Sequence, residues 1–98
     1  MKIIWMPRAL RTFFRVYDFT IESKGENQAE KLAVLTSKNI RLIKKQPYVF
    51  SAYDKRKYLR KGFITKHVSM FYKVKPRKEE IELLKFHDNR QDPKKIKL

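Results

Sequence analysis

The residues whose types could do chemistry lie close together near the end of the chain. His87, Asp88, Arg90 and Asp92 follow an apolar segment and precede a lysine-rich tail. An imidazole can take up or release a proton near neutral pH, and a guanidinium can stabilise negative charge that develops in a reaction. His87 and Arg90 are therefore the candidate catalytic residues. The alternative is local: His87 holds the turn by a hydrogen bond, and Arg90 forms a surface ion pair with Asp88 or Asp92, which contributes little stability.

A second group of candidates is a run of cations between residues 55 and 61. Phosphate or an acidic protein surface could bind there, although lysines on a strand also prevent unwanted pairing at a sheet edge. Five cations exceed what edge protection requires, so we interpret the run as a target-binding or nucleic-acid-binding surface. His67 is a weaker candidate for the same surface, expected in the middle of a strand. The run consists of Lys55, Arg56, Lys57, Arg60 and Lys61.

Composition limits the classes of function. Lys and Arg number 25 against 10 Asp and Glu in 98 residues, a net charge of +15. Self-repulsion on this scale favours an acidic or polyanionic partner, and charge alone does not choose among nucleic acid, ribosome, anionic membrane and acidic protein. The chain has no cysteine, two histidines and two glycines. We therefore expect no disulfide, no metal site, no glycine-rich phosphate loop and no cofactor. No apolar run suits a membrane span or a signal peptide, which predicts a cytoplasmic protein.

The first half of the chain predicts one strand and two helices. Residues 2–6 are apolar and rich in strand-forming residues, and Pro7 suits the first turn of a helix. Apolar residues then recur at spacings of three and four to about residue 23, with Arg8, Arg11 and Arg15 on the opposite, solvent-facing side. Gly25 breaks this pattern, a second helix is predicted for residues 26–45, and Pro47 prevents its continuation. The short link implies an antiparallel helical hairpin.

After Pro47 the apolar period changes to two, which is typical of strands. Strands are predicted for residues 53–62, 64–74 and 79–86, with turns near Gly62–Phe63 and at residues 75–78. The order is then β-α-α-β-β-β, an α+β fold in which the helical hairpin packs on one face of a small, mainly antiparallel sheet. We expect the other face to be open to solvent and to carry the basic strand, His67 and His87. Residues 1–98 form a single domain, with residues 92–98 as a flexible basic tail.

This element order, with Trp5 closing the first strand, the strand at residues 70–74 and the ending at residues 87–93, resembles the RelE/ParE superfamily of bacterial toxins. The resemblance covers nearly the whole chain. It implies the toxin of a type II toxin–antitoxin (plasmid stabilisation) system, neutralised by a cognate antitoxin that is usually acidic. RelE-like members cleave mRNA in the ribosome as mRNA interferases, whereas ParE-like members inhibit DNA gyrase and are not nucleases.

The chain departs from the RelE-like pattern in ways that leave the target open. RelE-like ribonucleases commonly place an arginine where this chain has Ser69, and no tyrosine follows His87. His87 and Arg90 lie near a late histidine and a late basic residue of the nucleases, but ParE-like chains end similarly. Ribosome-dependent mRNA cleavage and gyrase inhibition therefore both remain. The alternatives are a small non-catalytic nucleic-acid-binding protein and a degenerate toxin that keeps only partner binding.

Overall fold

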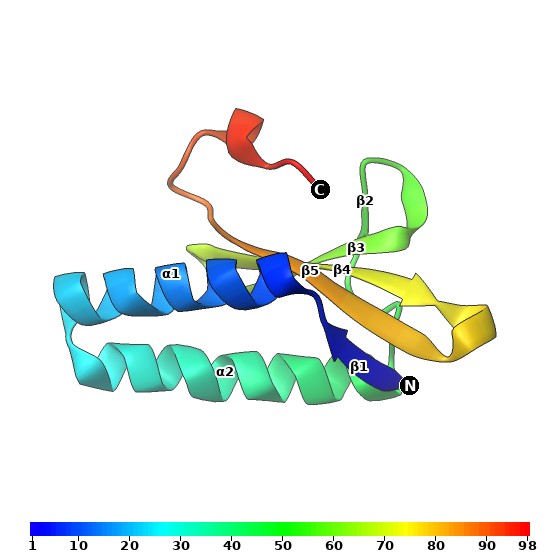
Figure 1. The fold of residues 1–98 in the computed structure, drawn as a ribbon, viewed down its shortest axis with the longest axis horizontal. Helices are drawn as coiled ribbons and strands as arrows, with labels where there is room; N and C mark the ends of the chain where they lie inside the picture. The colour runs from blue at the N-terminus through cyan, green and yellow to red at the C-terminus, as the bar shows by residue number, and fades with distance from the viewer.

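The computed structural model of residues 1–98 contains two long helices, five strands and two short 3₁₀ helices (Figure 1). The elements are β1 (Lys2–Trp5), α1 (Pro7–Lys24), α2 (Glu26–Lys45), β2 (Ala52–Tyr53), β3 (Arg56–Thr65), β4 (Val68–Lys75), η1 (Pro76–Lys78), β5 (Glu80–Asp88) and η2 (Pro93–Lys95). The predicted α+β class and the order of the major elements are confirmed. The short strand β2 is an addition that the sequence pattern did not reveal.

The strands form one mixed sheet in the order β1-β5-β4-β3-β2. β1 runs parallel to β5, with Lys2 opposite Glu80 and Trp5 opposite Leu83. The other neighbouring strands are antiparallel. Because β1 ends at Trp5, it covers only the first half of the β5 edge. The second half of that edge lies beside α1 instead, and this arrangement positions the candidate site.

The two helices are an antiparallel hairpin on one face of the sheet, as predicted (Figure 1). Pro7 opens α1, where its missing N–H costs no helical hydrogen bond. Gly25 separates the helices with a φ of 90°, a conformation that glycine adopts most easily. Neither helix combines the length and the apolar composition needed to cross a membrane.

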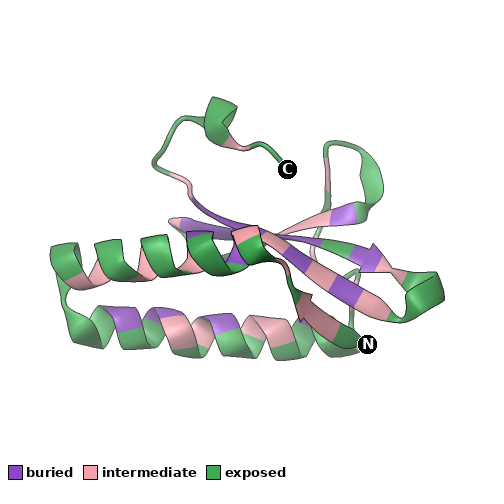
Figure 2. Ribbon diagram, in the orientation of Figure 1, coloured by how far each residue is buried: buried purple, intermediate pink, exposed green.

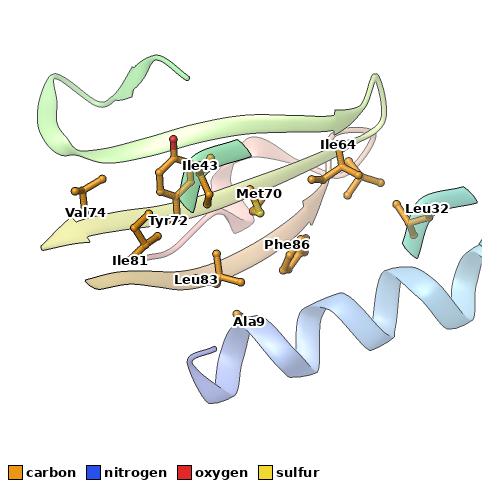
Figure 3. Packing of buried hydrophobic residues seen from close by; sticks show 11 residues of the cluster. Ala9, Leu32, Ile43, Ile64, Met70, Tyr72, Val74, Ile81, Leu83 and Phe86 are labelled. Atoms are coloured by element: carbon orange, nitrogen blue, oxygen red, sulfur yellow. The ribbon is translucent and has the colours of Figure 1, made fainter. Parts of the chain in front are cut away.

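The core lies between this hairpin and the sheet. Eleven buried residues form one cluster, in which Tyr72, Met70 and Phe86 supply much of the volume (Figure 3). Met70, Tyr72 and Val74 alternate along β4 on the face toward the helices, and Ile64 reaches the same core from β3. The apolar period of two predicted for the chain after Pro47 is therefore confirmed along β4. Phe86 also stacks on Trp5, with ring centroids 5.6 Å apart.

The opposite face of the sheet is less open than expected. Ser69, Phe71, Lys85 and His87 are all buried although they point away from the main core. Two segments cover them: Tyr53 packs edge-on against Phe71 at 4.9 Å, and the C-terminal tail folds back over the end of β5 (Figure 1). The tail and the turn after β2 are themselves exposed (Figure 2).

Two predicted boundaries were wrong. The β3–β4 turn lies at Lys66 and His67, not at Gly62–Phe63. Gly62 sits within β3 opposite Met70, where a Cβ would lie 2.7 Å from the Phe50 ring. The lack of a side chain at Gly62 therefore allows the Phe50 ring to pack against the strand, and it does not mark a turn. β3 also begins later than expected, because Asp54 and Lys55 have positive φ and turn the chain between β2 and β3.

Candidate functional site

His87 lies near the end of β5 on the face away from the main core. An extra residue in β5 shifts the register with β4, so that Lys85 pairs with Phe71 and His87 with Ser69. Before this bulge Ile81 and Leu83 face the core, and after it Phe86 does, so that the bulge turns Lys85 and His87 to the opposite face of the sheet. The His87 side chain is only 3% exposed. The structure therefore puts the candidate histidine in a covered pocket rather than on an open surface.

The surroundings of His87 favour its neutral form. Burial is the main cause that lowers its pKa, and the nearby Lys85 ammonium acts in the same direction, while Asp88 and the backbone of Gln91 near the ring oppose both. At neutral pH the ring is therefore uncharged and can accept a proton. Its Nε2 atom is buried and has no hydrogen-bond partner. Chemically, His87 could serve as a general base or bind a group that enters the pocket.

Arg90 does not form a joint site with His87, because its guanidinium is bound to Asp88. Its Nε donates to Asp88 Oδ1 at 3.0 Å and its Nη2 to Asp88 Oδ2 at 2.9 Å. Its guanidinium also lies 5.6 Å from the centre of the Phe19 ring. This bidentate contact with Arg90 lowers the pKa of Asp88. Asp88 and Arg90 thus form the surface ion pair that was the alternative interpretation of these residues.

His67 lies in the β3–β4 turn, which corrects its expected position in the middle of a strand. Its backbone N–H donates to Thr65 Oγ1 at 3.1 Å, and its carbonyl accepts from the Asn89 N–H at 2.7 Å. Partial burial and then Arg90 lower its pKa. His67 therefore neighbours Arg90, at the opposite end of β4 from the basic turn that precedes β3.

Ser69 occupies the position at which RelE-like nucleases were expected to carry an arginine. It is fully buried, and its hydroxyl donates to Asn89 Oδ1 at 2.7 Å. This bond ties β4 to the chain that leaves β5. The Ser69 side chain therefore holds the end of the sheet together. Because the site is fully buried, an arginine there would displace its neighbours.

The five cations of the basic run do not share one surface. Lys55 and Arg56 lie at the exposed turn before β3, where Arg56 is 3.9 Å from Asp54, and Lys57 contacts the ring of Tyr58. These three residues remain candidates for binding a polyanion. The ion pair between Arg56 and Asp54 is highly exposed and adds little stability.

Arg60 and Lys61 point to opposite faces of β3. Arg60 donates from Nε to the Lys57 carbonyl at 2.8 Å and from Nη1 to the Phe50 carbonyl at 2.9 Å, and it stacks near Tyr48. It therefore anchors the segment before β2. Lys61 pairs in register with Phe71 and lies on the same face as His87.

A cleft between α1 and β5 brings together cations that the sequence analysis did not select. We call it the α1–β5 cleft; its volume is about 280 Å³. Lys85 is the most buried of these cations at 8% exposure. Its signal in the sequence was a lysine within the apolar run of β5, whereas the α1 arginines looked like an ordinary solvent-facing side. The polar and charged residues that line the cleft are Arg8, Thr12, Arg15, Lys85, His87, Asp88, Gln91 and Lys95.

No group of three or more His, Asp or Glu side chains is arranged to hold a metal ion.

No family model matches the chain, and no curated protein matches its sequence. Solved structures do match. A structure of the chromosomal ParDE TA system from P. aeruginosa is 17% identical, with a TM-score of 0.72 over 90% of this chain and 95% of the other. The YoeB/ParE toxin from Agrobacterium tumefaciens is 15% identical, with a TM-score of 0.64 over 90% and 98%.

The isolated E. coli RelE toxin is also similar, at 13% identity and a TM-score of 0.64 over 94% of this chain and 87% of the other. These likenesses extend across both the helical hairpin and the sheet. The chain therefore has the fold of the RelE/ParE toxin superfamily, as the sequence resemblance implied.

Proposed function

We propose that this protein is the toxin of a type II toxin–antitoxin system and is neutralised by a cognate acidic antitoxin. The observation that carries the proposal is the shared fold, with a TM-score of 0.72 to the ParDE structure over 90% of the chain. The net charge of +15 suits an acidic partner. The helices also leave large apolar side chains exposed, among them Leu10, Phe14 and Val34, which a partner can cover.

For the target, we favour inhibition of DNA gyrase. Cleavage of RNA needs a base, a cation at the phosphate and a proton donor. Arg90 is held by Asp88 and does not join His87, and Ser69 supplies no guanidinium. This dispersal of the candidate groups supports a toxin that acts by binding.

Ribosome-dependent mRNA cleavage is the second candidate because of one specific observation. His87 has a free Nε2 and a lowered pKa, and Lys61 and Lys85 lie on its face of the sheet. In this alternative His87 is the catalytic base, and Arg90 leaves Asp88 to stabilise the charged phosphate. The exposed cations Lys55, Arg56 and Lys57 and the turn residue His67 then contact the nucleic acid.

The test is induced expression in bacteria without a partner, combined with labelled-precursor incorporation. We expect growth arrest in which thymidine incorporation stops before leucine incorporation. An early stop in leucine incorporation would instead identify the ribosome. If the neighbouring reading frame encodes a small acidic protein, as the proposal expects, its co-expression should restore growth.

Variants at the candidate catalytic residues separate the two targets. Under gyrase inhibition, His87→Gln and Arg90→Gln should each retain toxicity, and the purified chain should inhibit supercoiling by gyrase. Under mRNA cleavage, both changes should abolish toxicity and the ribosome-dependent cuts seen by primer extension. Circular dichroism of each variant establishes that it is folded.

Harmless expression would contradict the toxin proposal. If the harmless chain bound generic RNA or DNA with a steep salt dependence, it would be a non-catalytic nucleic-acid-binding protein. If it bound only the neighbouring acidic protein, it would be a degenerate toxin that keeps its partner.

A further inference from the structure

The α1–β5 cleft exists because β1 is shorter than β5. Beyond Leu83 the edge of β5 has no neighbouring strand and packs against α1. Thr12 Oγ1 accepts a hydrogen bond from the Phe86 N–H at 2.9 Å. This bond joins α1 to the edge of β5 and forms the floor of the cleft. Above this contact, α1, the outer face of β5 and the C-terminal tail enclose about 280 Å³. This volume is just below the range for drug-sized ligands, about 300–1,000 Å³, and suits a smaller group.

Positive charge in this cleft is not balanced by the protein. Arg8 and Arg15 from α1, Lys85 from β5 and Lys95 from the tail line it together with a single carboxylate, Asp88. Asp88 already accepts both bonds from Arg90. Lys85 is buried and Arg8 is partly buried, whereas Arg15 and Lys95 are exposed. Buried or partly buried cations are normally paired, and the one carboxylate of the cleft is committed to Arg90, so Lys85 and Arg8 call for an external anion.

Lys85 shows the imbalance most clearly. Its side chain is buried, and no carboxylate lies within ion-pair distance of it. Its Nζ donates to the Lys95 carbonyl at 2.8 Å, which uses one of the three donors of an ammonium group. Burial first, and then Arg8 and Arg15, lower the pKa of this lysine. An anion bound here would oppose both causes.

His87 gives a second and independent observation. It lines the same cleft, it is 3% exposed, and its Nε2 has no partner. Buried polar side-chain atoms almost always have a hydrogen-bond partner, and each exception requires an explanation. An oxygen of a ligand in the cleft supplies that partner when Nε2 carries the ring proton, as it does in one tautomer of the neutral imidazole and in the imidazolium.

We propose that the α1–β5 cleft binds a phosphate group. Lys85 and His87 face the ligand from β5, and the guanidinium groups of Arg8 and Arg15 approach it from α1. Guanidinium groups match the paired oxygens of phosphate, and a phosphate that carries up to two negative charges balances more of the excess than one carboxylate does. The ligand is either free phosphate or the terminal phosphate of a nucleotide. The inference requires neither the gyrase nor the ribosome target.

The experiment is an NMR titration of the full-length chain with sodium phosphate, with sodium chloride used to hold the ionic strength constant. The ring signals of His87 should shift and saturate, and the side-chain signals of Lys85 should follow the same curve. His67 lies outside the cleft and provides an internal reference that should stay nearly unchanged. A pair of dinucleotides, with and without a 5′ phosphate, then distinguishes nucleotide from free phosphate.

The decisive variant is Arg8→Gln/Arg15→Gln. Each charge-assisted hydrogen bond is worth about 1.5–3 kcal/mol, so loss of these groups should weaken phosphate binding at least about tenfold. The matched control is Arg11→Gln/Arg41→Gln, which removes two exposed guanidinium groups outside the cleft. It should change the affinity less than about twofold. Neither variant removes a core residue, and thermal unfolding of each establishes that it is folded.

Four results would overturn the proposal. Chloride could reproduce the shifts, or His67 could shift as much as His87, which would show general attraction to a basic protein. The two double variants could lose affinity equally. N-acetylglutamate could bind as tightly as phosphate, which would reassign the cleft to the carboxylates of an acidic protein. Growth arrest is a separate measurement, so failure here leaves the proposed toxin function standing.

Discussion

Thr12 connects the first helix to the last strand through one oxygen atom. Its Oγ1 donates to the Arg8 carbonyl at 2.7 Å and accepts from the Phe86 N–H at 2.9 Å. Both Thr12 and Phe86 are buried. The hydroxyl therefore satisfies a buried N–H of β5 at a point where the neighbouring element is a helix and not a strand. A buried backbone donor without a partner is expensive.

Thr12→Val should reduce the free energy of unfolding by about 1–3 kcal/mol, because it leaves the Phe86 N–H unsatisfied in a buried position. Urea unfolding measures the change. Thr36→Val is the matched control: Thr36 is equally buried, but its hydroxyl only donates within its own helix, to the Leu32 carbonyl. Its loss should cost less than about 1 kcal/mol. Equal costs at the two positions would contradict the assigned role of Thr12.

Tyr72 predicts a pH dependence at the alkaline end. Burial raises the pKa of Tyr72 from 10.0 to about 12, and its hydroxyl donates to the Pro47 carbonyl at 2.7 Å. A raised pKa means that the folded state holds this proton more tightly than the unfolded state does. The contribution is therefore complete below about pH 10 and is lost as the pH rises from about 10 through about 12.

The comparison with Tyr72→Phe isolates this effect from the titrating lysines. Near neutral pH the variant should be less stable by about 1 kcal/mol, because it lacks the bond to Pro47. As the pH rises through the alkaline range, the free energy of unfolding of the wild type should fall by about 2–3 kcal/mol more than that of the variant. The order of stability should therefore reverse. Parallel curves across this range would show that Tyr72 does not titrate as described.

The candidate site illustrates what residue types alone can predict. An ion pair of Arg90 with Asp88 or Asp92 was one of two interpretations of these residues, and their spacing could not choose between the two carboxylates, since each is two residues from Arg90; the structure selects Asp88. The burial of His87 did not follow, since it depends on a bulge in β5 and on a tail that folds back over the strand. Lys85 was missed for the same reason: a lysine in an apolar run gives no sign of which arginines approach it from a distant helix.

At the scale of elements, the segment before β2 is fastened to β3 from two sides. Arg60 donates to the Phe50 carbonyl, and the Phe50 ring lies directly over Gly62, so that a Cβ there would meet ring atoms at 2.7 and 2.9 Å. The ring takes the space that a side chain on β3 would need. This contact explains why a glycine is present in the middle of a strand.

Gly62→Ala should therefore destabilise the protein by about 1–3 kcal/mol, although alanine suits a strand at least as well as glycine does. Thermal unfolding measures the effect. In a Phe50→Leu background the smaller side chain relieves the overlap, so the same substitution should cost clearly less. Additive effects of the two changes would show that the ring does not restrict this position.

The elements differed in how well the sequence predicted them. The helices were located closely because apolar spacing, Pro7, Gly25 and Pro47 mark their ends by local chemistry. The predicted position of the β3–β4 turn was wrong because it relied on Gly62. This glycine is required by its close contact with the Phe50 ring, which belongs to another segment of the chain. β2 pairs through only two residues, Ala52 and Tyr53, which is too short for any periodic pattern.

At the scale of the whole molecule, charge opposes the fold. A net charge of +15 on 98 residues produces repulsion that salt can screen. Raising sodium chloride from about 0.01 to about 1 M shortens the Debye length from about 30 to about 3 Å. The melting temperature should rise by several degrees, the shift that about 1 kcal/mol produces in a domain of this size.

A variant with fewer charges tests this explanation. Lys57→Gln/Lys78→Gln/Lys97→Gln removes three exposed cations that form no ion pair. It should melt higher than the wild type at low salt and gain less from added salt. A salt response equal to that of the wild type would point to a general effect of chloride rather than to self-repulsion.

The parallel pairing of β1 with β5 has a consequence for biosynthesis. Lys2 through Trp5 find their partners only at Glu80 through Leu83, and β5 also pairs with β4 along its length. A nascent chain emerging from the ribosome therefore exposes its first strand and half-covered helices until β5 has been synthesised. The sheet closes only once β5 is free. Any surface that depends on the closed sheet, the α1–β5 cleft included, forms no earlier than that step.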